Sequence, residues 1–205
     1  MRIRLLLVAL AAACCCAAVQ AAGEHERRLA AEVIVMAGDV RRLLAAEGGP
    51  LEREGLARRV NGALSSLPML LRRANGDPHP VVAMRAASAR GDWRALAAAL
   101  ATLQRQYPFA ARTLLPVSPG PEMLALGASI HTSTCAACHD SPSGADILLP
   151  AKNLTAQLKS MPREEFAARL WLGVRGDRTT GLRNPFSDAE LAALMVLYST
   201  AEGVR

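Results

Sequence analysis

The sequence is poor in aromatic residues, since three Phe, two Tyr and two Trp make up only 3% of its 205 residues. So few rings argue against a stacking platform for single-stranded nucleic acid. A strong excess of one charge is also lacking: 24 Lys and Arg against 18 Asp and Glu leave a formal net charge of +6. Nucleic acid is therefore not an expected partner. The hydrophobic share of 51% is ample for a core and excludes a wholly disordered chain.

Runs of β-branched residues are few, whereas alanine is abundant and apolar residues recur every three to four positions. This pattern is typical of amphipathic helices, so we expect an all-α fold. In the first half the expected helices are 24–47, 51–73, 80–89 and one that Asp92 caps. In the second half they are 121–130, 154–158, 162–172 and a last helix opened by the capping box Ser187–Glu190. Pro68 is expected to kink or split the helix 51–73.

Long apolar runs are lacking after the first twenty residues. Arg2 and Arg4 precede a short apolar run, and Val19-Gln20-Ala21 offers a small-residue cleavage site. Residues 1–21 are therefore predicted to be a signal peptide, and the protein to be exported or periplasmic. Ala13-Cys14 ends an imperfect lipobox, which leaves a lipoprotein open; membrane association is expected only if Cys14 is lipidated.

Prolines cluster at one place in the chain: four of the twelve fall from Pro108 to Pro121. Such a stretch predicts a semi-rigid linker between domains. We therefore expect a signal peptide followed by three segments: an N-terminal helical domain at 22–107, a Pro-rich linker at 108–120 and a second domain at 121–205.

Cysteine is scarce once the leader is set aside, because only Cys135 and Cys138 remain. They lie in Cys135-Ala136-Ala137-Cys138-His139, the signature of covalent haem attachment. Two thiols on one turn can form thioethers with the two vinyl groups of a porphyrin, and the adjacent His139 is then directed at the iron. Haem c, one per chain, is the predicted cofactor.

Three other interpretations of this cysteine pair stay open at this point. Exported chains often carry disulfides, so Cys135 and Cys138 could be bridged. A zinc site would need two further ligands, but His25, His79 and His131 have no zinc-like spacing. A thioredoxin-like redox pair normally follows a βαβ pattern, which is lacking here.

Beyond the pentapeptide, residues of about 121–201 resemble the class I cytochrome c family. Gly127 stands eight positions before Cys135, where that family has a glycine at the crossing of its first and last helices. Tyr198 resembles the aromatic residue of the last helix that packs at this crossing. Segments 165–173 and 185–191 resemble the middle helix with its glycine end and the Pro-containing entry to the last helix. Residues 23–115 resemble no family in this way.

The resemblance implies a cytochrome c-like domain that transfers single electrons between redox partner proteins and is not an enzyme. It also implies that the carbonyl of Pro150, eleven residues after His139, holds the N–H of the proximal imidazole. Arg175, Arg178 and Arg183 would either neutralise haem propionates or form a basic rim for an acidic partner. Trp171 would lie at the haem edge or in the core.

Two positions depart from the family. His131 stands where Phe or Tyr is usual, which suggests an aromatic substitute at a partly buried packing site. Asn184 stands directly before Pro185, where the family has the Met that fills the sixth iron position.

The departure at Asn184 leaves the sixth iron position open in the prediction. Met161 is the first candidate for that ligand, and an open or water-bound site is as well supported. Met195 is expected in the core and His79 in a loop. An open position would suit a second function, a haem module that binds or senses a small ligand.

Overall fold

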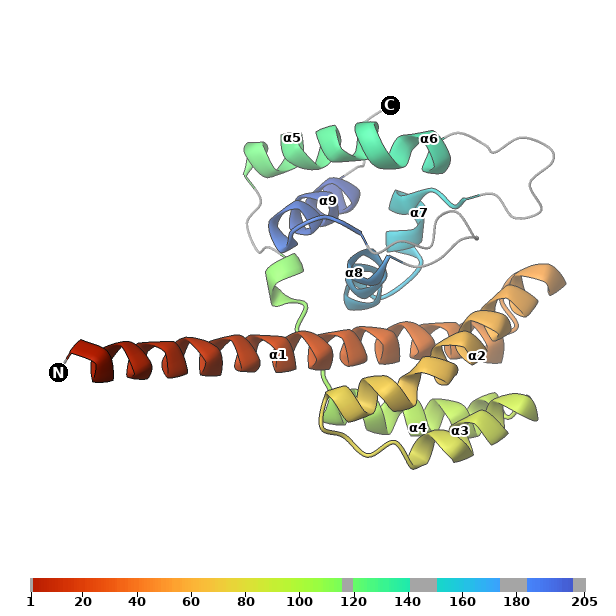
Figure 1. Ribbon diagram of the computed structural model, residues 1–205. Coiled ribbons are helices and arrows are strands. Elements are labelled where there is room, and N and C mark those ends of the chain that lie inside the picture. Colours follow the sequence, from red (N-terminus) through yellow and green to blue (C-terminus); the bar gives the residue numbers. More distant parts are fainter. Residues whose placement is uncertain (1, 116–119, 141–150, 174–183, 201–205) are drawn as a thin grey trace. The chain divides into compact units, whose positions relative to one another are not determined.

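The computed structural model describes residues 2–115, 120–140, 151–173 and 184–200 (Figure 1). Every regular element in these ranges is helical and none is a strand, which confirms the expected all-α class. None of the helices in the described part of the chain is long and apolar enough to cross a membrane.

The chain divides into two compact units. The first unit comprises residues 1–47 and 53–108, and the second comprises 48–52 and 109–205. Inside the segment expected as a linker, Arg112–Leu114 forms a short 3₁₀ helix, η1, whose Leu114 is fully buried. The Thr113 hydroxyl also donates a hydrogen bond to Asp188 at 2.9 Å. Residues 109–115 therefore pack within the second unit.

The first unit is made of four helices. They are α1 (Arg2–Leu44), α2 (Pro50–Arg73), α3 (Pro80–Ala89) and α4 (Trp93–Gln106). Helix α4 packs against both α1 and α3, and Asp92 caps it by accepting a hydrogen bond from the Ala95 N–H at 3.0 Å. The core is mainly aliphatic: Leu29, Val33, Met36, Val40, Val60, Leu64, Leu67, Leu71, Met84, Leu96 and Leu100.

Pro68 lies inside α2 without splitting it. A proline has no N–H, so the carbonyl of Leu64 four residues earlier loses its usual helical donor. The Arg85 Nε of α3 donates to this Leu64 carbonyl at 3.1 Å, and an Arg85 Nη donates to the next carbonyl, of Ser65, at 3.0 Å. A guanidinium from a neighbouring helix thus replaces the donor that the proline lacks.

Replacing Arg85 with Ala is expected to lower the free energy of unfolding by about 1–2 kcal/mol, because two main-chain carbonyls lose a charged donor. The Pro68→Ala background is the matched control, since residue 68 then supplies its own N–H to Leu64. Urea denaturation of the four chains should show a smaller cost of Arg85→Ala in that background. An equal cost in both backgrounds would show that Arg85 does not compensate for Pro68.

The second unit is built around its last helix (Figure 1). Helix α9 (Asp188–Thr200) packs against η1, α5 (Pro121–Ile130), α7 (Leu154–Lys159) and α8 (Arg163–Leu172). All its residues from Leu191 to Tyr198 are buried. Between α5 and α7 come one wide turn, η2 (His131–Cys135), and the short α6 (Ala136–His139).

The ends of these helices follow the capping chemistry of the sequence. Glu190 accepts from the Ser187 N–H at 2.8 Å while the Ser187 hydroxyl accepts from the Glu190 N–H at 3.3 Å, which confirms the expected capping box. Gly173 ends α8 with a φ of +66°, a conformation that other residues rarely adopt. The wide turn η2 closes with a bond from the Ala136 N–H to the His131 carbonyl, five residues earlier.

Candidate functional site

The crossing of α5 and α9 leaves no room for a side chain at Gly127. A Cβ atom built there would lie 2.8 Å from the Ala193 carbonyl carbon and 3.2 Å from the Leu197 Cβ. The neighbour is therefore rigid backbone rather than the end of a flexible side chain. The expected close crossing of the first and last helices of this unit is confirmed at Gly127.

Replacing Gly127 with Ala is expected to destabilise the second unit by about 1–3 kcal/mol, because α5 and α9 must move apart. Gly62 of α2 is a suitable control, since nothing lies within 4 Å of a Cβ built there. Gly62→Ala should stabilise the protein by up to about 1 kcal/mol. Thermal unfolding of both variants checks the contrast, and equal effects would contradict the tight crossing.

The two thiols lie one helical turn apart, directly after this crossing. Cys135 ends the wide turn η2 and is half-buried, while Cys138 is exposed on α6; both are free thiols. The disulfide that the sequence left open is therefore not formed in this structure. Burial raises the pKa of Cys135, and a hydrogen bond with Tyr198 opposes that shift. The thiol form is thus favoured at Cys135.

His139 follows the second thiol and has a defined partner. Its Nδ1 lies 2.7 Å from the Lys152 carbonyl oxygen, which can only accept. Nδ1 therefore carries the proton, and in the neutral ring the lone pair is on Nε2. Pro150, the expected partner, lies outside the described residues. The carbonyl that His139 binds belongs to Lys152, two residues further on.

A zinc site finds no support in the described part of the chain. No group of three or more His, Cys, Asp or Glu side chains comes together there in a way that could hold a metal ion. Cys135, Cys138 and His139 therefore form no such group with further His, Cys, Asp or Glu side chains among the described residues.

His131 connects the attachment turn to the last helix. Its ring packs edge-on against Tyr198, with centroids 5.5 Å apart, so the expected aromatic packing role is confirmed. Its Nδ1 lies 3.0 Å from the Tyr198 hydroxyl, and its Nε2 lies 2.8 Å from a carboxylate oxygen of Asp140. Phe166 of α8 also packs edge-on with Tyr198, with ring centroids 5.9 Å apart.

The candidates for a sixth iron ligand, Met161, Met195 and His79, lie on different segments of the chain, and Asn184 stands at the position where a Met was expected. The Asn184 side chain donates a hydrogen bond to the Leu170 carbonyl of α8. Met161 is partly buried just before α8, whereas Met195 is buried inside α9, as expected of a core residue. His79 belongs to the first unit, where its exposed ring lies 2.6 Å from Asp77.

Two further expectations concern the arginines and Trp171. Trp171 is buried on α8. Arg175, Arg178 and Arg183 lie outside the described residues, so their expected roles stay predictions.

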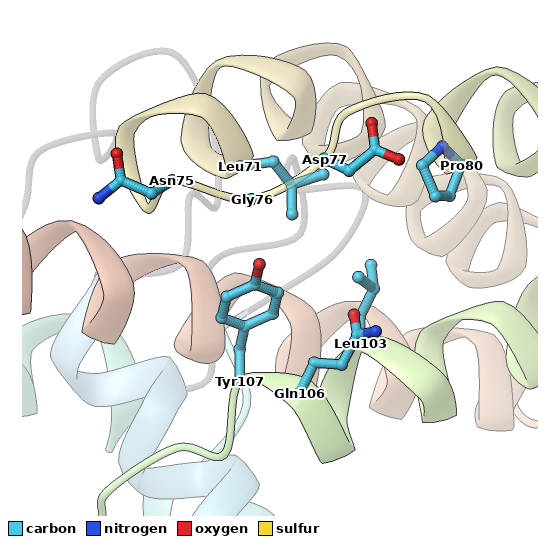
Figure 2. Close-up of a pocket in the computed structure, with 8 residues that line it drawn as sticks. All are labelled: Leu71, Asn75, Gly76, Asp77, Pro80, Leu103, Gln106 and Tyr107. Atoms are coloured by element: carbon cyan, nitrogen blue, oxygen red, sulfur yellow. The ribbon is translucent and has the colours of Figure 1, made fainter.

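The first unit contains a cavity of about 440 Å³ between the loop after α2 and the end of α4 (Figure 2). Tyr107 points across it toward Gly76 and Leu71, and polar rim groups come from Asn75 and Asp77. Its lining includes no Cys, His or Met, so this cavity carries none of the predicted haem chemistry.

Sequence reasoning missed the partners of the histidines. The hydrogen bond from His139 to the Lys152 carbonyl could not be predicted from the type of residue 152, because every residue has a main-chain carbonyl. Asp140 and Tyr198 are 9 and 67 positions from His131, and only folding brings them together. Comparison of the chain with protein-family models, curated proteins and solved structures yields no match.

Proposed function

We propose that the second unit is a cytochrome c-like domain that holds one haem covalently through Cys135 and Cys138, with His139 as an axial iron ligand. The observation that carries this proposal is the hydrogen bond from His139 Nδ1 to the Lys152 carbonyl. It fixes the tautomer whose Nε2 lone pair can bind iron, directly beside two free thiols on one turn.

The surroundings of the pentapeptide also fit this cofactor. The close approach at Gly127 and the ring contact between Phe166 and Tyr198 make a tight apolar support behind the attachment turn. Such support would hold the thiols and His139 in a fixed relation to a planar porphyrin. Bound haem would supply an iron that alternates between the ferric and ferrous states.

The residues of the chain would then set the conditions for electron transfer. Cys135 and Cys138 would tether the porphyrin, so the carrier keeps its cofactor in both states. The Lys152 carbonyl would orient His139 and make its imidazole a better donor. Electrons would pass to and from other proteins at the porphyrin edge, so the protein needs no substrate-binding residues of its own.

The proposed setting is the periplasm or another exported location, after removal of residues 1–21, or with a lipid at Cys14. The proposed partners are redox proteins, with an acidic docking surface if Arg175, Arg178 and Arg183 form a basic rim.

A second candidate function is supported by Asn184. Its side chain is engaged with the Leu170 carbonyl at the position where the family has its sulfur ligand. If no other group fills the sixth position, the same unit would bind a small diatomic ligand and act as a haem-based sensor.

Spectroelectrochemical titration of the purified protein separates the two functions. A carrier should show one reversible one-electron step with little spectral change under carbon monoxide. A sensor should show high-spin ferric iron and a ferrous form that binds carbon monoxide. A protein that has no haem spectrum after export would contradict both.

A further inference from the structure

The hydrogen bonds of His131 reach the haem-attachment segment from two sides. Nε2 binds Asp140, the residue directly after His139, and Nδ1 binds the Tyr198 hydroxyl. Tyr198 in turn shares a hydrogen bond with Cys135. His131 is thus hydrogen-bonded to the residue next to the proposed iron ligand His139. On its other side, the Tyr198 hydroxyl connects it to Cys135, a proposed attachment point of the haem.

In the neutral ring these bonds have a fixed direction. The Asp140 carboxylate only accepts, so His131 carries its proton on Nε2 and Nδ1 must accept from the Tyr198 hydroxyl. Tyr198 is a reliable donor, because burial and the neighbouring Cys135 raise the pKa of its phenol well above the ordinary value. The single Tyr198 hydroxyl hydrogen is then directed at His131 and not at the Cys135 sulfur, whose charged form it would stabilise.

Protonation of Nδ1 would reverse part of this network. Nδ1 would become a donor to the Tyr198 oxygen, and the Tyr198 hydroxyl would turn toward the Cys135 sulfur. A thioether sulfur at Cys135 has no hydrogen of its own and can accept this bond. A proton at His131 would therefore change the reduction potential of the proposed haem, both through its charge and through the hydrogen bond to the Cys135 sulfur.

We propose that His131 is a redox-linked proton site, which binds a proton more tightly when the proposed haem is reduced. This inference rests on the proposed function. When a donor protein passes one electron to the haem, a fraction of the molecules takes up a proton from water at Nδ1 of His131, and this fraction releases the proton to water when an acceptor protein oxidises the haem. Water has access, because the His131 side chain is 16% exposed and that of Asp140 is 48% exposed.

The sign of the coupling follows from charge. Reduction lowers the charge of the haem by one, so a cation at His131 is better tolerated in the ferrous state. By linkage, the reduction potential falls as pH rises through the range in which His131 loses its proton. In the part of the chain that the structure describes, the ionisable groups that face His131 are Asp140, Tyr198 of α9 and, beyond Tyr198, Cys135 of η2.

The test compares the protein with its His131→Phe variant, which keeps an aromatic ring at the packing site and loses both hydrogen bonds. The potential of each is measured from pH 5 to pH 9, and the His131 ring is followed by nuclear magnetic resonance in both redox states. The proton affinity of His131 should be higher in the ferrous state by roughly three- to tenfold. The pH dependence of the potential should shrink in His131→Phe and stay unchanged in His79→Phe, an exposed histidine of the first unit.

The same pH dependence in the protein and in His131→Phe, or the same His131 midpoint in both states, would overturn the inference. Tyr198→Phe is a second variant, used if His131→Phe does not accumulate, because it keeps the ring contact and removes the hydroxyl. It should make the difference in His131 proton affinity between the ferric and ferrous states smaller. An unchanged difference would contradict the coupling through Tyr198. Haem content is measured first in every case. Absence of covalent haem refutes the proposed function, whereas covalent haem with a proton-independent potential refutes only the role of His131.

Discussion

A chain carrying both Cys135→Ala and Cys138→Ala should yield no protein with covalently bound haem. Only these two thiols remain outside the expected signal peptide, and both are free in the fold. The second unit should also lose stability, because the apolar surface that would pack on the porphyrin is then left without it. The measurement is haem absorbance of the exported protein after denaturing gel electrophoresis.

The single variants sharpen this result. Each leaves one thiol, so each should retain haem through one bond at reduced yield. Ser133→Ala is a control in the same turn, since the Ser133 hydroxyl bonds the Ile130 carbonyl at 3.2 Å and the Thr134 hydroxyl at 3.3 Å, and neither bond involves a thiol. Full covalent haem in the double variant would show that the attachment site lies elsewhere.

Asn184→Met should convert a weakly filled sixth iron position into a stable low-spin one if the segment before Pro185 approaches the haem. A Met sulfur is a far better ligand for ferrous iron than an amide, and Met ligation raises the reduction potential. Removing the Asn184 hydrogen bond to Leu170 should cost about 1 kcal/mol of stability. Asn184→Leu shares that cost and supplies no sulfur, so it is the matched control.

Met161→Ala identifies the ligand in the unmodified protein. A change to high-spin iron would assign Met161 as the sixth ligand, and an unchanged spectrum would remove it. If the unmodified ferrous protein does not bind carbon monoxide and shows a stable Met–iron absorption band, the hypothesis of a weakly filled sixth iron position is wrong.

Local signals in the sequence predicted most of the helices. The bounds of α3 and α5 and the capping box at Ser187 follow from Pro, Ser and Glu at helix starts, which act within one turn. Gly127 was identified by resemblance, and the structure shows its physical reason in the Ala193 backbone.

Long-range contacts set the limit of that reasoning. Pro68 was expected to kink or split its helix. The helix is not split, and Arg85 from the next helix, 21 positions away, supplies the missing donor. Part of the expected linker packs on the second unit, because Leu114 finds a buried site. The Pro150 carbonyl was expected to hold His139, but the partner is the Lys152 carbonyl. A main-chain carbonyl carries no residue-specific pattern that would single out Lys152.

The most direct test of the central claim is the intact mass of the exported protein after denaturation and extraction with acidified organic solvent. We expect one species whose mass exceeds that of the mature polypeptide by one haem, with the haem absorbance remaining on the chain. A polypeptide of unmodified mass, with haem released into the solvent or never bound, would contradict it.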